Sequence, residues 1–199
     1  TYFCLFDECE KLTQDCDYRV SILQPVYDFF DFKEKAFVSA TPLEVSHPAF
    51  EGQGFKKLEI VPQYDYRKDL HLIVTSSYER TVREEFQRLK DSSCVCIFLN
   101  SVTGINELVN SLHLEGESRI FCSEDGVGKL KDVGFTNAVS SIDYPLAKYN
   151  FFTSRFYSAV DIELNVKPDI LILTNLNNAV YTTVDPYTEA IQIQGRFRR

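Results

Sequence analysis

Two adjacent carboxylates, Asp7 and Glu8, are the first residues of the chain whose types and spacing could do chemistry. They end the apolar run 3–6, which shows no polar alternation and so predicts a strand covered on both faces, as in a parallel α/β sheet. Ligands of such sheets gather beyond the carboxyl ends of the strands, where two acids could hold a magnesium ion and a water molecule. Acids in this position are also typical of a solvated turn or of the first turn of a helix.

The amino-acid composition limits the class of protein to which the chain can belong. The 199 residues are 44% hydrophobic and 25% charged, as in ordinary globular proteins, and no apolar segment reaches membrane-spanning length. A secretory signal is not evident at the start, so we expect a cytoplasmic protein that does not contact membranes. The formal net charge of −8 argues against a broad basic face that coats nucleic acid, but it leaves room for a local cationic groove. Nothing in the sequence demands more than a monomer.

The elements that must position the acids alternate along the chain. Strand patterns separated by helical patterns predict an α/β fold with parallel sheets and right-handed crossovers. A stretch rich in proline and glycine, residues 43–63, predicts a boundary between a first domain at residues 1–60 and a second at residues 61–199. Further strands are predicted near 36–42, 70–75, 94–99, 119–123, 149–153 and 169–174, and helices near 19–30, 78–89, 105–112 and from Pro186 towards Arg199.

Four stretches in a fixed order resemble the superfamily 2 helicases and translocases, whose motors are two RecA-like domains with ATP bound between them. Residues 7–10, Asp-Glu-Cys-Glu, look like motif II, and residues 39–42, Ser-Ala-Thr-Pro, match motif III. Residues 153–162 look like motif V, and residues 192–199 fit the Q-x-x-G-R-x-x-R form of motif VI. The resemblance covers nearly the whole chain and implies two RecA-like parallel-sheet domains, the first incomplete and the second nearly complete.

In the first domain the resemblance implies an ATP and Mg²⁺ site. Asp7 would hold the metal through water, while Glu8 would position and deprotonate the attacking water. Ser39 and Thr41 would relay the state of the ATP site to the contact between the domains. As plain sequence, these two hydroxyls are equally compatible with a simple strand end.

In the second domain the resemblance implies contacts with nucleic acid and with nucleotide. Thr153 and Ser154 would bind a nucleic-acid phosphate, and Asp161 would accept from the ATP ribose or from an arginine. DNA is favoured over RNA as the track.

The end of the chain resembles the arginine fingers of the family. Gln192 and Gly195 would line the nucleotide, while Arg196 and Arg199 would stabilise charge on the γ-phosphate. These arginines lie three residues apart, so on a helix they would project to one side. The structural alternative is a basic last turn that complements the helix dipole.

One motif of the family is absent from these residues: no G-x-x-x-x-G-K-[ST] loop occurs in the sequence. We therefore expect a fragment that begins after this phosphate-binding loop and hydrolyses ATP poorly by itself. The function implied is that of an ATP-dependent helicase or translocase core. The alternatives are a non-catalytic scaffolding or nucleic-acid-binding module derived from a helicase, and an ATP-driven switch that does not unwind.

Overall fold

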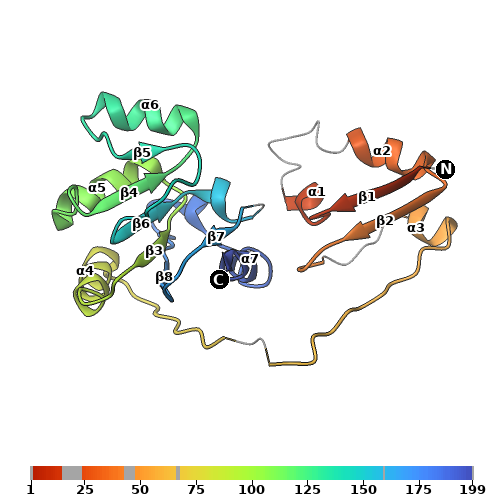
Figure 1. Cartoon of the computed structure of the whole chain (residues 1–199), viewed down its shortest axis with the longest axis horizontal. Helices are drawn as coiled ribbons and strands as arrows, with labels where there is room; N and C mark the ends of the chain where they lie inside the picture. The colour runs from red at the N-terminus through yellow and green to blue at the C-terminus, as the bar shows by residue number, and fades with distance from the viewer. Residues whose placement is uncertain (1, 15–23, 43–47, 66–67, 159, 199) are drawn as a thin grey trace. The chain divides into compact units, whose positions relative to one another are not determined.

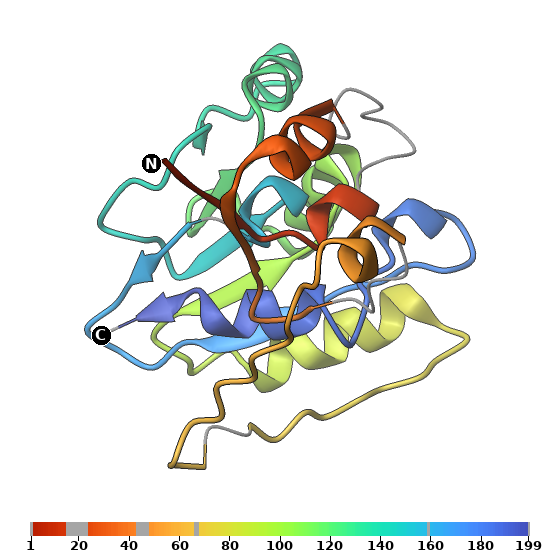
Figure 2. The ribbon, with the colours of Figure 1, turned by 90° about the vertical axis from the view of Figure 1, so that its right-hand side faces the viewer.

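The computed structural model of the chain describes residues 2–14, 24–42, 48–65, 68–158 and 160–198. It divides into two compact units, Thr1–Val74 and Thr75–Arg199. Residues 55–65 and 68–77 contain no helix or strand and form an extended trace (Figures 1 and 2). The domain boundary predicted after residue 60 falls within this trace.

The strand expected at residues 70–75 is wrong. The stretch is mostly apolar, as a buried strand would be, yet the side chains of Leu70, Leu72 and Val74 are exposed. None of the described strands pairs with this segment. An apolar pattern without a neighbouring strand to supply backbone hydrogen bonds does not make a sheet.

The first unit is built on a pair of parallel strands, β1 (Phe3–Asp7) and β2 (Glu34–Val38), in a register that sets Asp7 opposite Val38. Phe6 and Phe37 lie side by side on one face, where they contact Phe29 of α2 (Gln24–Asp31). The described part of this unit also contains two short helices, α1 (Lys11–Gln14) and α3 (Pro48–Gly52). The side chains of Phe3 and Leu5 alternate with that of Phe6, so they point to the opposite face, where they are exposed.

The second unit contains a five-stranded, all-parallel sheet in the order β5-β4-β6-β3-β8 (Figure 1). The α/β class with a parallel sheet is therefore confirmed. Its strands are β3 (Val95–Phe98), β4 (Ser118–Phe121), β5 (Ala138–Val139), β6 (Tyr149–Phe152) and β8 (Asp169–Ile172). Its long helices are α4 (Tyr78–Arg88), α5 (Val102–Leu112) and α6 (Glu124–Asp132).

Both faces of this sheet are covered at its centre, where every residue of β3 and of β6 is buried, the polar Asn150 included. On one face, Val95 and Ile97 pack in a core with residues of α4, α5 and α6. On the other, Cys96 and Phe98 pack with residues that follow β6 and with Ile193 of α7 (Glu189–Gly195). The elements on this second face also include η2 (Ser154–Phe156), β7 (Ile162–Glu163) and β9 (Phe197–Arg198).

The helix expected to run from residue 186 to the end of the sequence is shorter than predicted. It spans Glu189–Gly195, and the chain then changes direction so that Phe197 and Arg198 pair in parallel with Ile162 and Glu163. Strand pairing with a distant segment overrides the local helical pattern here. Arg196 therefore follows the helix instead of lying in it, and the expectation that it shares a helix face with Arg199 involves a residue outside the described ones.

Within the described parts of the chain, no helix combines the length and the apolar content needed to cross a membrane.

Candidate functional site

The carboxyl ends of β1 and β2 lie next to each other, so the residues that follow the two strands meet. Glu10 is only 2% exposed, and its carboxylate accepts from the Ser39 hydroxyl at 2.5 Å and from the Thr41 hydroxyl at 3.3 Å. The Thr41 backbone N–H also donates to Ser39 Oγ at 2.9 Å. The acidic stretch and the hydroxyl pair therefore form one hydrogen-bonded cluster, which joins the motif II-like and motif III-like segments.

The backbone at Glu8 adopts the left-handed conformation, with φ of 51°. This region costs a residue with a side chain about 1 kcal/mol, and such strain concentrates at functional sites. The Glu8 N–H donates to Asp7 Oδ1 at 2.9 Å, and the Glu8 carbonyl accepts from the Lys11 N–H at 3.0 Å as α1 begins. Glu8 thus lies at a tight corner between β1 and α1.

The Asp7 and Glu8 carboxylates fit a magnesium ion held in the usual protein manner. Mg²⁺ keeps several waters and binds through one or two carboxylates together with substrate phosphates. Asp7 is exposed and Glu8 is half-buried, so both can reach solvent at the strand end. A group of three or more His, Cys, Asp or Glu side chains, which would indicate an all-protein metal cage, is not found in the described portion of the chain.

Cys9 lies between these acids, and its environment disfavours the thiolate. Burial raises the pKa of the Cys9 thiol, and the nearby Glu10 and Asp7 carboxylates raise it further. A Cys thiol whose pKa is raised is a poor nucleophile near neutral pH. Nothing at this position therefore indicates thiol catalysis.

In the second unit, the residues expected to bind a phosphate follow β6. Thr153 is buried, and both its N–H and its hydroxyl donate to the Phe121 carbonyl, at 3.1 and 3.4 Å. Ser154 is exposed, and its N–H donates to Asn100 Oδ1 at 3.3 Å. A phosphate contact from the Thr153 hydroxyl would require that hydroxyl to leave Phe121, whereas the Ser154 hydroxyl is accessible.

Gln192 and Arg196 form a pair at the end of α7. The half-buried Arg196 guanidinium donates from Nη2 to Gln192 Oε1 at 2.8 Å and from Nε to the Gln192 carbonyl at 3.0 Å. Its Nη1 donates to the Val160 carbonyl at 3.5 Å, and its backbone carbonyl accepts from the Ile162 N–H at 2.8 Å. The motif V-like and motif VI-like segments are thereby held together.

The remaining residues predicted to act at the nucleotide are Gly195, Asp161 and Arg199. Gly195 is the last residue of α7, and a Cβ atom added there would meet no heavy atom within 4 Å. Asp161 is exposed immediately before β7. Arg199 lies outside the described residues.

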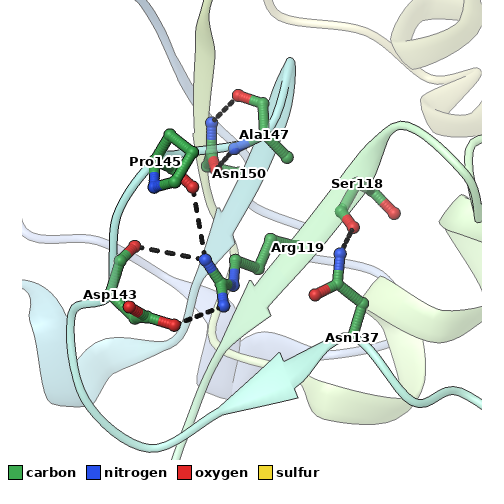
Figure 3. Close-up of polar contacts among 7 residues, drawn as sticks. All are labelled: Ser118, Arg119, Asn137, Asp143, Pro145, Ala147 and Asn150. Carbon is green, nitrogen blue, oxygen red and sulfur yellow. Dashed lines mark hydrogen bonds and ion pairs between the residues drawn. The ribbon is translucent and has the colours of Figure 1, made fainter.

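The loop between β5 and β6 is fastened to the sheet by the side chain of Arg119 (Figure 3). Its guanidinium forms an ion pair with Asp143 at 2.6 Å and donates to the Asp143 and Pro145 carbonyls, each at 3.3 Å. Asn150 holds the far end of the loop, because its amide accepts from the Ala147 N–H at 2.9 Å and donates to the Ala147 carbonyl at 2.7 Å.

The side chain of Tyr144 connects this loop to β7. The Tyr144 hydroxyl accepts from the Glu163 N–H at 2.8 Å. Since β7 pairs with β9 and with the carbonyl of Arg196, the loop supports the strand that holds the end of α7.

Sequence reasoning assigned no role to Glu10, Asn100 or Tyr144. Glu10 stood inside the quoted acidic motif, so its position was a usable signal. Asn100 follows a predicted buried strand, where polar residues often serve a site. Tyr144 lies in a loop, and nothing in the local sequence indicates its contact with Glu163.

Comparison of the chain with models of known protein families, with curated proteins and with solved structures found no match.

Proposed function

We propose that this chain is the core of an ATP-dependent nucleic-acid motor of the helicase or translocase type, with two RecA-like units. The observation that supports the proposal best is the hydrogen bonding of Glu10 to both Ser39 and Thr41. It links an acidic strand end, suited to nucleotide hydrolysis, to a hydroxyl pair that can respond when the strand end moves. DNA is the favoured track, with RNA as the alternative.

In this proposal Asp7 and Glu8 act directly on the ATP hydrolysis reaction. A magnesium ion bound through water at Asp7 would neutralise phosphate charge. Glu8 orients the attacking water and accepts its proton, because phosphoryl transfer depends mainly on positioning and on charge stabilisation. Glu10 is already engaged with the Ser39 and Thr41 hydroxyls, so Glu8 is the acid that this proposal assigns to the attacking water.

Arg196 is the cation of the second unit that would act on the nucleotide. Three of its N–H groups are used to hold Gln192 and Val160, which fixes the direction of the guanidinium. A planar guanidinium held in this way retains further N–H donors for phosphate oxygens.

The test is ATP hydrolysis by the natural protein that contains this chain, with and without single-stranded DNA or RNA. We expect nucleic acid to raise the rate, and we expect Glu8→Gln to abolish turnover while nucleotide binding is largely retained. Glu34→Gln, at an exposed acid at the opposite end of β2, is the matched control and should behave as the wild type. A rate indifferent to nucleic acid, or equal loss of binding and turnover in Glu8→Gln, would contradict the proposal.

Strand displacement then separates the kinds of motor. Displacement of a labelled strand that requires ATP identifies a helicase. ATP hydrolysis without displacement identifies a translocase or an ATP-driven switch, and nucleic-acid binding without hydrolysis identifies a non-catalytic module.

A further inference from the structure

Tyr181 is an exposed aromatic residue that is nevertheless fixed at two points. It lies in η3 (Val180–Thr182), and 65% of its surface is exposed. Its backbone carbonyl accepts from Asn100 Nδ2 at 3.3 Å, and its hydroxyl shares a hydrogen bond with Ser101 Oγ at 3.3 Å. The ring is therefore held near the end of β3 without being covered.

The turn that carries Tyr181 is itself anchored by Thr182. The Thr182 side chain is fully buried, and its hydroxyl donates to the Ala179 carbonyl at 2.7 Å and accepts from the Asn175 N–H at 2.9 Å. These bonds close the segment between β8 and η3 into a compact loop. The position of Tyr181 is thus set before any ligand arrives, which lowers the entropic cost of binding.

Asn100 connects Tyr181 to the predicted phosphate contact. The same side-chain amide that donates to the Tyr181 carbonyl accepts from the Ser154 N–H through its oxygen. Ser154 and Tyr181 therefore share one partner at the carboxyl end of the sheet, where ligands of parallel sheets bind.

We propose that Tyr181 is a stacking platform for an unpaired nucleobase of the strand whose phosphate lies at Ser154. This inference rests on the proposed function, since it assumes a single-stranded nucleic acid as ligand. An exposed, preorganised ring suits base stacking because every base offers a π face, whatever the sequence. The net charge of −8 argues against a broad basic face, so a stacking contact would supply affinity that such a face otherwise provides.

Tyr187, in the segment between η3 and α7, provides a matched control. It is 81% exposed, and its backbone N–H donates to Asp185 Oδ1 at 2.8 Å. Its ring, unlike that of Tyr181, has no hydroxyl contact among the described residues. Loss of an exposed aromatic ring alone is therefore tested by Tyr187→Ala.

The experiment measures binding of the full chain to a fluorescent oligonucleotide of about 12 deoxythymidines by anisotropy. We expect Tyr181→Ala to weaken binding about 5- to 150-fold, which corresponds to the 1–3 kcal/mol typical of one stacked base. Tyr181→Phe should retain most of the affinity, and Tyr187→Ala should match the wild type. A single abasic site moved along the oligonucleotide should weaken wild-type binding at one position and should have no effect on Tyr181→Ala at that position.

Several results would overturn the inference while leaving the proposed function standing. These are wild-type affinity in Tyr181→Ala, equal losses in Tyr181→Ala and Tyr187→Ala, or equal losses in Tyr181→Phe and Tyr181→Ala, which would assign the effect to the hydroxyl. Failure of the wild-type chain to bind the oligonucleotide, or its uridine counterpart, would count against both proposals. Circular dichroism of each variant checks that the fold is kept.

Discussion

The hydroxyl of Ser39 has two partners in the first unit: it donates to Glu10 and accepts from the Thr41 backbone N–H. We expect Ser39→Ala to lower local stability by about 1.5–3 kcal/mol, as for a hydrogen bond to a charged group. The Thr41 amide should then exchange its hydrogen faster, as measured by NMR. Ser39→Thr retains the hydroxyl and should keep most of the protection. Unchanged hydrogen exchange at Thr41 in Ser39→Ala would show that the Ser39 hydroxyl does not stabilise the cluster.

The alkylation rate of Cys9 reports on the corner between β1 and α1, because it depends on how much of the thiol is ionised. Because burial and two carboxylates raise the pKa of its thiol, less thiolate is present at a given pH than in an unperturbed cysteine. Alkylation of Cys9 by iodoacetamide at pH 8 should therefore be slower than that of a cysteine in an unstructured peptide, as followed by mass spectrometry of the labelled peptides. Glu10→Gln removes one of the charges and should speed the reaction. Alkylation of Cys9 at the peptide rate would show that the corner is open.

The sequence predicted that acids lie at this corner, whereas it did not predict the different contacts that the individual acids make. Asp7 and Glu8 follow an apolar run, which suffices to place them at a strand end. The bond from Ser39 to Glu10 was not predictable because it joins segments distant in the sequence, and the left-handed backbone at Glu8 was not predictable because this conformation is uncommon for a glutamate. Likewise, the hydroxyl of Thr153 was assigned to a ligand, but it donates to the Phe121 carbonyl because a buried hydroxyl needs a partner.

The loop between β5 and β6 links the interior of the sheet to β7, and the Tyr144 hydroxyl makes a hydrogen bond with the backbone of β7. We expect Tyr144→Phe to remove the acceptor of the Glu163 N–H and to speed exchange of that amide roughly 2- to 10-fold, in line with about 0.5–1.5 kcal/mol for one neutral hydrogen bond. Hydrogen exchange followed by NMR measures this effect. Tyr64→Phe, at an exposed residue of the first unit, is the control. Equal exchange at Glu163 in both variants would show that the loop does not support β7.

Helices and buried strands were predictable where the apolar residues of a segment follow a single helical or strand-like spacing. Residues 78–88 form the expected helix, with Val82 and Phe86 buried, and Ser101 caps α5 by accepting from the Gly104 N–H at 3.0 Å. The end of α7 was not predictable, because its neighbour Phe197 joins a strand whose partner lies more than thirty residues earlier in the chain. Long-range pairing of this kind leaves no periodic trace in the local sequence.

At the level of the whole chain, the extended trace between α3 and α4 should be the first site of proteolysis. Residues 55–65 and 68–77 lack regular structure, and Lys56, Lys57 and Lys68 are exposed there. Limited trypsin treatment should cut at these lysines before it cuts within α4 or α5, leaving a resistant fragment that contains the five-stranded sheet. Mass spectrometry of the time course identifies the sites. Early cleavage inside the sheet, with the trace intact, would contradict the division into two compact units.

The two-stranded sheet of the first unit has a practical consequence for handling the protein. β1 pairs only with β2 among the described strands, so the outer edge of each strand presents backbone groups that are not engaged in a ladder. The apolar side chains of Phe3, Leu5 and Val38 are exposed on these same strands. Such edges template the addition of further strands from other molecules. Concentrated samples of the chain should therefore lose material to aggregates through the first unit, and a charged replacement at Leu5 is the simplest way to keep them in solution.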